Sequence, residues 1–528
     1  MQITLIHPPL ISINAPNVLP SGLGTLAGFL RKNDVSVELI DMDALLRSRV
    51  FTSSQSKRLS KDLQAFYDNQ NRAGHYSGIS ERANDGLAER LLNLTSIAKD
   101  CTPVGISILS FAQILSALLL AEKIKKEYHR PVVVGGPFVT EFAHLFFPRY
   151  DFIDYAVAGE GEIPLLRLIH AINGKGRLED VPSLWYRNAS KPVFTGRVFY
   201  DIKNQTCPDF DGLPLELYKR PQIDNKIGIP YSLSRGCLNN CNFCTFRNDD
   251  GPWQTKSIKK VIHEITLLKE KYKTNFFSFS DTNFNVSNEY AEDVCDALID
   301  SGLNIRWWVL AQPTGLDKEL LAKIKKAGCY MLAWGMESAS SRVLQMMGKE
   351  DTEIKEKINI LRMAKEVGIS NIVNLMTRYP YETVDYLKKT AFFIKDNADI
   401  IDQANIGYFN LYAGSNIFNN PQKARIKIKE NHSTSLNHMY SFEEIDRKQT
   451  PELKKELDYW REKIMDYNFK YIVSNRHRFP YNVFFRLFGL KLRRLIDYWS
   501  GKFYFSRYYW IIKNRLKYLI LVPYRHHD

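Results

Sequence analysis

Three cysteines lie within eight residues of the chain, at Cys237, Cys241 and Cys244. Their spacing is Cys-x3-Cys-x2-Cys, and an aromatic residue, Phe243, directly precedes the last of them. Three thiolates on one short loop can hold three irons of a [4Fe–4S] cluster. The fourth iron would have no nearby protein ligand, and an open coordination position lets a metal bind and activate another molecule. The spacing therefore predicts an iron–sulfur centre that does more than carry electrons.

Two other interpretations of the cysteines are possible. Free cysteines are among the most buried residues, so the three thiols could simply be packed in a core. A structural zinc site would need a fourth ligand at a suitable spacing, and the nearest candidates, His263 and Cys207, fit no zinc pattern. The clustering of three of the seven cysteines favours the iron–sulfur interpretation.

The cysteine motif resembles that of the radical S-adenosylmethionine (SAM) enzymes. The resemblance implies that the amino and carboxylate groups of SAM chelate the fourth iron. It also implies that an electron from the cluster splits SAM into methionine and a 5′-deoxyadenosyl radical. Phe243 would then lie against the cofactor.

Residues 226–430 alternate strand and helix signals, which predicts a partial (β/α)6 barrel. Helical stripes of apolar residues begin at Ile258 and at Ile354. The cysteine loop follows the first strand, so it would lie at the carboxyl ends of the strands, where such barrels hold their sites. The expected strands are Ile229–Leu233, Asn275–Ser280, Ile305–Leu310, Tyr330–Trp334, Asn371–Met376 and Ala404–Leu411.

Polar residues follow several of these strands and are candidate SAM contacts. The segment Gly335-Met-Glu-Ser resembles the Gly-x-Glu-Ser segment of the radical SAM superfamily, in which these residues contact SAM. Each position has the alternative of a helix N-cap, which Ser, Thr and Asp favour. The candidates are Asp281 and Asn283 after the second strand, Gln312 after the third, and Gly335, Glu337 and Ser338 after the fourth.

The turn after the fifth strand departs from the superfamily pattern. Many relatives have a glycine-rich turn ending in Pro-Gly-Glu-Thr, whereas this chain reads Thr-Arg-Tyr-Pro-Tyr-Glu-Thr over 377–383. An arginine at 378 could pair with a phosphate or carboxylate of the substrate. A salt bridge from Arg378 to a neighbouring acid is the alternative.

Residues 1–173 also alternate strands and helices, which predicts a doubly wound parallel sheet of Rossmann-like type. Four segments resemble the cobalamin-binding domain of one radical SAM class: His-Pro-Pro at 7–9, residues 19–23, Gly-Gly-Pro at 135–137, and Gly-Glu-Gly-Glu at 159–162. The cobalamin-contact candidates are Pro8, Gly135, Gly136, Gly159 and Glu160. The Asp-x-His-x-x-Gly cobalt-ligand motif is absent, so the resemblance implies cobalamin without that ligand, or a domain that has lost it.

Residues 174–225 have little periodicity and five prolines, which predicts a linker. A helical, basic and aromatic-rich region is expected at 431–528. The net charge is +14, and the last 59 residues contribute +11 of it, with thirteen Lys or Arg against two Asp. This region could form a solvated helical layer on the barrel or contact an anionic membrane surface, with nucleic acid least favoured.

The combined expectation is a cobalamin-dependent radical SAM methyltransferase that acts on an unactivated carbon. The resemblance implies two uses of SAM, one to methylate cobalamin and one to generate the radical. A non-methylating cyclisation or rearrangement and a non-catalytic binding protein are the alternatives; methylthiolation is disfavoured because no second cysteine triad is present. Expected partners are a small-molecule, lipid or peptide substrate and a flavodoxin- or ferredoxin-like electron donor. A cytoplasmic location is expected, or a peripheral one at the inner membrane face.

Overall fold

The computed structural model describes residues 1–10, 18–50, 58–59, 61–63, 82–93, 102–220, 223–245, 251–349, 353–429, 439–447 and 450–473. The chain divides into one compact unit, Met1–Ile464, and a second, Met465–Asp528. Within the second unit, the described residues end helix α16 and form a short π-helix, Asn468–Val473. The basic aromatic segment predicted to contact a membrane or to pack on the barrel, Tyr481–Tyr524, lies outside the described residues.

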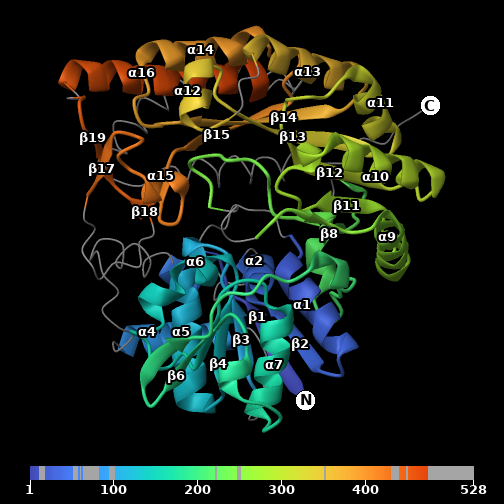
Figure 1. Ribbon diagram of the computed structural model, residues 1–528, viewed down its shortest axis with the longest axis vertical. Helices are drawn as coiled ribbons and strands as arrows, with labels where there is room; N and C mark the ends of the chain where they lie inside the picture. Colours follow the sequence, from blue (N-terminus) through green and yellow to red (C-terminus); the bar gives the residue numbers. More distant parts are fainter. Residues whose placement is uncertain are drawn as a thin grey trace. The chain divides into compact units, whose positions relative to one another are not determined.

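The first sheet has seven strands in the order β2-β1-β3-β4-β5-β6-β7 (Figure 1). Because β2 lies on one side of β1 and β3 on the other, the direction of winding reverses between β1 and β3, where doubly wound sheets bind ligands. The predicted parallel sheet is confirmed for its five parallel strands: β1 (Gln2–His7), β2 (Ser36–Asp41), β3 (Val104–Ser107), β4 (Val132–Gly135) and β5 (Tyr155–Val157).

Helices cover this sheet. They connect successive parallel strands, as the predicted alternation of strands and helices requires. A large apolar core forms between the sheet and α4, α5 and α6. The helices are α1 (Ser21–Lys32), α2 (Met42–Val50), α4 (Arg82–Leu92), α5 (Phe111–Tyr128), α6 (Pro137–Phe146) and α7 (Glu162–Ile172).

The stretch predicted to be a linker contains regular structure. Strands β6 (Leu184–Asn188) and β7 (Lys191–Phe194) extend the first sheet in antiparallel fashion. The expectation of little regular structure over 174–225 is therefore corrected. The hairpin is short, and its residues alternate weakly, so the period-2 signal was hidden among prolines and charges. Single-turn 3-10 helices lie at Leu178–Asp180, Ile202–Asn204 and Leu215–Tyr218.

The second large sheet has six parallel strands in the order β8-β11-β12-β13-β14-β15, as expected for a partial barrel. Helices connect successive strands and cover one face (Figure 1). The strands are β8 (Gly228–Tyr231), β11 (Phe276–Phe279), β12 (Arg306–Ala311), β13 (Cys329–Glu337), β14 (Ser370–Thr377) and β15 (Gln403–Tyr408).

The barrel helices confirm the two predicted apolar stripes. Val261, Ile265 and Leu268 are buried on α9, and Ile360, Leu361 and Ala364 are buried on α13. The helices are α9 (Ile258–Tyr272), α10 (Asn288–Asp300), α11 (Lys318–Lys326), α12 (Ser341–Met346), α13 (Ile354–Glu366) and α14 (Val384–Asp396), with a 3-10 turn at Phe284–Val286.

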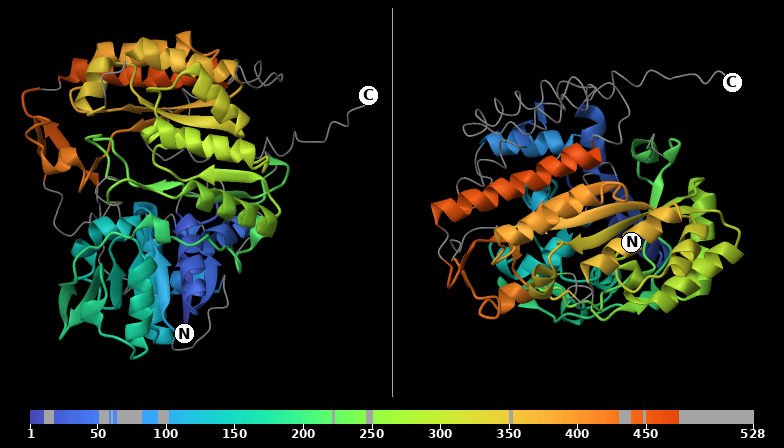
Figure 2. Two further views of the ribbon diagram at one scale, coloured as in Figure 1. Left: turned by 45° about the vertical axis from the view of Figure 1, so that its right-hand side comes forward. Right: turned by 90° about the horizontal axis from the view of Figure 1, so that it is seen from above.

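The chain after the barrel packs back on it. Helix α16 (Pro451–Tyr467) runs beside α14, and the rings of Trp460 and Phe392 are 6.0 Å apart (Figure 2). Two small antiparallel pairs precede it, β16 (Leu411–Tyr412) with β18 (Met439–Tyr440) and β17 (Ile426–Ile428) with β19 (Phe442–Glu444). Helix α15 (Asn416–Asn419) lies between β16 and β17 in the sequence.

Candidate functional site

The cysteine loop begins where β8 gives way to a small hairpin, β9 (Ser234–Arg235) with β10 (Gln254–Thr255). Gly236 turns the chain with φ +81, and a Cβ there would lie 2.9 Å from the Pro252 carbonyl oxygen. Only glycine therefore fits this turn without strain. The turn directs Cys237 and the following residues away from the hairpin at the carboxyl end of β8, as predicted.

One residue, Asn242, anchors the loop between Cys241 and Cys244 through its backbone and its side chain. Its backbone N–H donates to the Met347 carbonyl at 2.8 Å, and its side-chain amide donates to Met346 at 2.9 Å. The Asn242 carbonyl accepts from Ile417 at 2.9 Å. The ends of α12 and the start of α15 thus hold the middle of the cysteine loop.

The three thiols fit an iron–sulfur cluster better than a single metal ion. All three cysteines are half-buried, and Cys237 and Cys244 both act electrostatically on Cys241. Burial raises the pKa of Cys241 to about 11, and the Lys349 ammonium opposes that rise. In the described part of the chain, no three metal-ligating side chains converge on one ion position. A cluster does not need such convergence because each thiolate binds a different iron, whereas zinc requires it.

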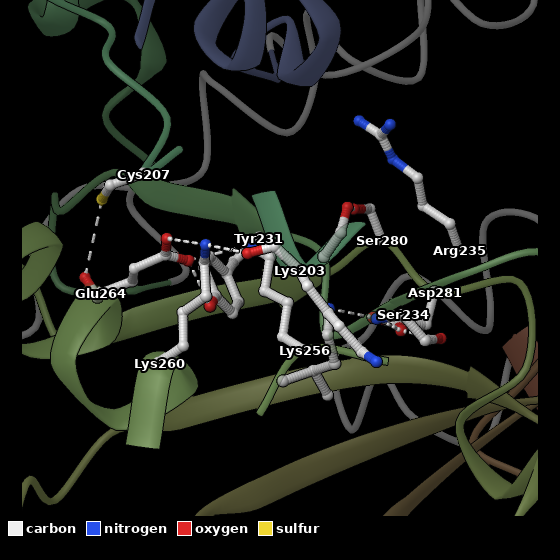
Figure 3. Close-up of polar contacts among 12 residues, drawn as sticks. Lys203, Cys207, Tyr231, Ser234, Arg235, Lys256, Lys260, Glu264, Ser280 and Asp281 are labelled. Carbon is white, nitrogen blue, oxygen red and sulfur yellow. Dashed lines mark hydrogen bonds and ion pairs between the residues drawn. The ribbon is translucent and has the colours of Figure 1, made fainter. Parts of the chain in front are cut away.

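The described cysteines outside the loop, Cys207, Cys295 and Cys329, are packing residues. Cys295 and Cys329 are buried, and burial raises the pKa of both thiols. Burial also raises the pKa of Cys207 to about 12, and its Sγ lies 3.9 Å from the Glu264 carbonyl oxygen (Figure 3).

Asp281, a candidate SAM contact, braces the start of the cysteine loop. Its carboxylate accepts the backbone N–H groups of Leu233 and Ser234 at 3.1 and 2.6 Å, and also the Ser234 hydroxyl (Figure 3). The Asp281 side chain is buried. These contacts give Asp281 a positioning role at the base of the loop; a direct SAM contact stays a prediction.

A buried ionic group lies beneath the same strand. Glu264 on α9 accepts from the Lys256 ammonium at 2.8 Å and from the Tyr231 hydroxyl at 2.7 Å, and these three side chains point toward one another (Figure 3). Lys256 is 1% exposed, and its ammonium also lies 4.1 Å from the centre of the Tyr231 ring. The group therefore ties α9 to β8 and to the residue that follows β10.

The end of β13 brings the Gly-Met-Glu-Ser residues to the same edge. The register with β14 shifts between Gly335 and Glu337, and Glu337 has φ +59, a left-handed conformation unusual for glutamate. The Lys349 ammonium donates to the Gly335 carbonyl at 2.7 Å and to Glu337 Oε1 at 3.1 Å. The Ser338 hydroxyl accepts the Ser340 N–H at 3.1 Å, as a capping side chain does.

The remaining barrel candidates also lie at strand ends. Asn283 is buried, and its Oδ1 has no hydrogen-bond partner among the described residues, so it can accept from a ligand. The Gln312 backbone is held by Asn285, whose side chain accepts from its N–H and donates to its carbonyl. Phe243 packs against an apolar cluster that includes Met347. Their contacts with SAM stay predictions.

In the first domain, the carboxyl edge of the sheet borders a cavity of about 350 Å³. Gly136 has φ +101, and a Cβ there would lie 2.7 Å from the Ile108 carbonyl oxygen. A Cβ on Gly135 would meet only ordinary contacts, so the absence of a side chain leaves the cavity wall open at this residue. Gly159, with φ +126, also lines the cavity. Ser232, Ser234, Arg235, Gly236, Ser280 and Thr282 line it as well, and all six come from the barrel sequence around the cysteine loop.

Two predicted residues of the first domain have structural partners. The Pro8 carbonyl accepts from the Gln113 amide at 2.8 Å, which fixes the chain after β1. Glu160 accepts from Arg235 at 3.1 Å and from the Tyr200 N–H. Arg235 also pairs with Glu162 at 2.6 Å, so one arginine two residues before Cys237 joins the hairpin to the Gly-Glu-Gly-Glu segment.

Comparison with known proteins decides the family. Residues 231–394 match the Radical SAM superfamily. This part of the chain is a radical SAM domain. Membership in this superfamily implies a [4Fe–4S] cluster and SAM, and the cysteine loop lies inside the matched residues.

Relatives of this radical SAM chain have different activities in their names. An uncharacterized methyltransferase of Pyrococcus horikoshii is 28% identical over 321 residues, which cover 59% of this chain and 68% of that protein. An anaerobic magnesium-protoporphyrin IX monomethyl ester cyclase of Rubrivivax gelatinosus is 25% identical over 350 residues, covering 63% of this chain and 61% of the cyclase.

A solved structure resembles both sheets of the radical SAM chain. It is the radical SAM methyltransferase TsrM from Kitasatospora setae with cobalamin and a [4Fe–4S] cluster bound, with a TM-score of 0.60 and 18% identity. The match covers 81% of this chain and 80% of TsrM. At this identity the likeness concerns the fold: a B12-binding-like first region followed by a partial barrel.

Sequence reasoning missed three contributors to the radical SAM site. Arg235 lies two residues before the cysteine motif, but its partners Glu160 and Glu162 lie more than 70 residues away in the sequence. Lys349 and Lys256 carried no signal, because a lysine between helices normally reads as a surface residue. None of the helices in the described ranges is both long and apolar enough to cross a membrane.

Proposed function

We propose that this radical SAM enzyme binds cobalamin and methylates an unactivated carbon of a small-molecule substrate. The observation that carries the proposal is the cavity lined both by the carboxyl edge of the first sheet and by residues around the cysteine loop. Gly105 and Ser107 line it at the end of β3, which is the place where a doubly wound sheet binds its ligand.

The residues around the cavity are suited to two cofactors. Bound at these positions, the cluster with SAM would supply a carbon radical, and cobalamin would supply the methyl group. Cys237, Cys241 and Cys244 would hold three irons, and the Oδ1 of Asn283 offers an acceptor for the SAM ammonium. The bare wall at Gly135 would let a flat ring approach the backbone.

Methyl transfer is proposed in preference to ring closure because the relatives include methyltransferases, and the solved structure with this fold is named a methyltransferase. The cyclase relatives make a cyclisation the main competitor. The solved methyltransferase has also been obtained with its tryptophan substrate and a SAM analogue, which supports a small-molecule substrate here.

The test is a methyl-transfer assay on the cluster- and cobalamin-loaded enzyme. With methyl-labelled SAM, a reductant and fractionated cell extract, we expect label in a product together with S-adenosylhomocysteine and 5′-deoxyadenosine. Formation of 5′-deoxyadenosine without S-adenosylhomocysteine would contradict methylation and favour a cyclisation or rearrangement.

A pair of variants at one position tests the cobalamin site. Gly135→Leu places a large side chain on the open wall, so we expect at least a tenfold loss of cobalamin affinity, measured by cobalamin absorbance after gel filtration. Gly135→Ala is the matched control, because its Cβ meets nothing closer than 3.8 Å. Equal retention of cobalamin by wild type and Gly135→Leu would remove this cavity as the cobalamin site.

A further inference from the structure

The turn after β14 has an unusual backbone. Arg378 has φ +66 and Tyr381 has φ +59, and both residues carry side chains where left-handed conformations favour glycine. Strain of this kind persists only where surrounding contacts hold it, and it gathers at functional sites.

Buried hydrogen bonds and an ion pair of Glu382 stabilise this turn. Glu382, 6% exposed, accepts the Arg378 backbone N–H at 3.1 Å with one carboxylate oxygen. Its other oxygen accepts two N–H groups of Arg461 on α16, at 3.0 and 2.9 Å. Arg447 donates to the Glu382 carbonyl at 2.8 Å. The turn is thus built from contacts that span up to 79 residues of sequence.

The Arg378 side chain takes no part in that support. Its guanidinium lies 4.2 Å from the centre of the Tyr408 ring at the end of β15, and both residues are exposed, Tyr408 by 52%. No ion pair joins Arg378 to an acid in the described ranges, so the alternative of a neighbouring salt bridge does not hold there. The nearby acid, Glu382, is already paired with Arg461.

Arg378 lies at the same edge of the sheet as the cysteine loop. It directly follows β14, and the carboxyl ends of parallel strands lie at one edge, where barrels hold their sites. The paired strands below it present neutral amides: Asn405 donates to Asn374 at 3.0 Å. The guanidinium is therefore an exposed cation over the Tyr408 ring, and the one carboxylate that acts on it, Glu382, is paired with Arg461.

We infer that Arg378 binds an oxyanion of the substrate, a carboxylate or a phosphoryl group, at the mouth of the barrel. A guanidinium presents paired N–H groups that match two oxygens of such a group, and stacking on Tyr408 fixes its plane. This assignment gives the substrate class of the site and rests on the proposed function for its reaction.

Arginine modification tests the assignment without a known substrate. Phenylglyoxal is applied to the cluster-loaded full chain, alone or with millimolar inorganic phosphate or succinate, and peptide mass mapping follows each arginine. Arg306 is the internal control: it is exposed and stacked on Phe276 at 4.9 Å, but it begins β12 at the opposite edge.

We expect the anions to slow modification of Arg378 several-fold and to leave Arg306 unchanged. Protection by phosphate alone assigns a phosphoryl group, and protection by succinate alone assigns a carboxylate. If neither anion slows the modification of Arg378 relative to that of Arg306, the inference is wrong.

Arg378→Gly gives the second arm, since glycine accepts φ +66 and the substitution removes the arginine side chain without straining the turn. When the methyl acceptor has been found, we expect this variant to raise KM for it more than tenfold at unchanged iron content, and Arg378→Lys to raise KM less. An unchanged KM in Arg378→Gly also overturns the inference. The anions could protect Arg378 while no fraction of the extract accepts a methyl group. That result would support the anion site and reject the proposed methyltransferase activity.

Discussion

At the scale of single residues, the candidate cluster ligands depend on neighbours that have no redox chemistry. Asn242, between two of the cysteines, makes hydrogen bonds to the end of α12 and to α15 through its backbone and its side chain. Gly236 supplies a turn that another residue would strain. The spacing of the thiols is therefore set by the loop before any metal binds, which lowers the conformational entropy lost on cluster binding.

Cys241→Ala should abolish the brown absorbance of the reconstituted protein, because two thiolates from one loop cannot hold a [4Fe–4S] cluster stably. Iron and sulfide should fall from about four of each per chain to a small fraction. Cys295→Ala, at a buried cysteine outside the loop, is the control and should keep the absorbance. An unchanged spectrum in Cys241→Ala would reject the cluster assignment.

At the scale of elements, α9 and β8 are held together by charges as well as by apolar packing. Lys256 and Glu264 are 1% and 5% exposed, so neither can exchange its partner for water. A buried pair is not itself strong evidence of stability, but removing one member leaves an uncompensated charge in the core. The pair also lies beneath the strand that leads into the cysteine loop.

Glu264→Gln should lower the free energy of unfolding by about 3–5 kcal/mol, since it leaves the Lys256 ammonium buried without a counter-charge. Urea unfolding of the apo protein measures the change. The control is Asp385→Asn, which removes an exposed pair with Lys389 on α14 and should cost at most about 1 kcal/mol. Similar losses in both variants would show that Lys256 finds another partner.

At the scale of the whole Met1–Ile464 unit, ion pairs connect the two sheets with their helices. Asp209 accepts from Arg31 of α1 at 2.8 Å and from Lys271 of α9 at 2.7 Å. The Arg235 pairs with Glu160 and Glu162 connect the same two halves near the cysteines. The Arg235 pairs join two parts of the cavity wall, one from the first sheet and one from the barrel.

The Asp209 bridge predicts a pH dependence of stability. Burial alone would raise the pKa of this carboxyl, but hydrogen bonds from Lys271, the Asp211 N–H and Arg31 outweigh it and lower the pKa to about 2. A depressed folded pKa stabilises the protein above the unfolded value of about 3.9, and the stabilisation is lost as the pH falls toward 2.

Asp209→Asn should therefore be less stable than wild type at pH 7, by about 1 kcal/mol for a partly exposed pair. The difference should shrink between pH 5 and pH 2, as measured by chemical denaturation of the apo protein. Asp211→Asn, whose carboxylate is 56% exposed, is the control and should change less. A difference that stays constant with pH would mean that Asp209 acts through packing.

The sequence alone determined the features that depend on neighbouring residues. The three cysteines and the alternation of parallel strands and helices along the chain follow from spacing and periodicity, which local chain geometry dictates. The family followed from the same short motifs. The hairpin at 184–194 was missed because four- and five-residue strands with mixed polarity carry little periodic signal.

Only the tertiary structure decided which distant side chains meet. Glu160 with Arg235, Tyr231 with Glu264, and Glu382 with Arg461 are separated by 75, 33 and 79 residues. Such pairs depend on the order of strands in a sheet and on where a later helix packs, and no chain-local pattern encodes either. For the same reason, the sequence predicts either a salt bridge or a substrate contact for Arg378. The structure shows that the neighbouring acid, Glu382, is already paired with Arg461 of α16.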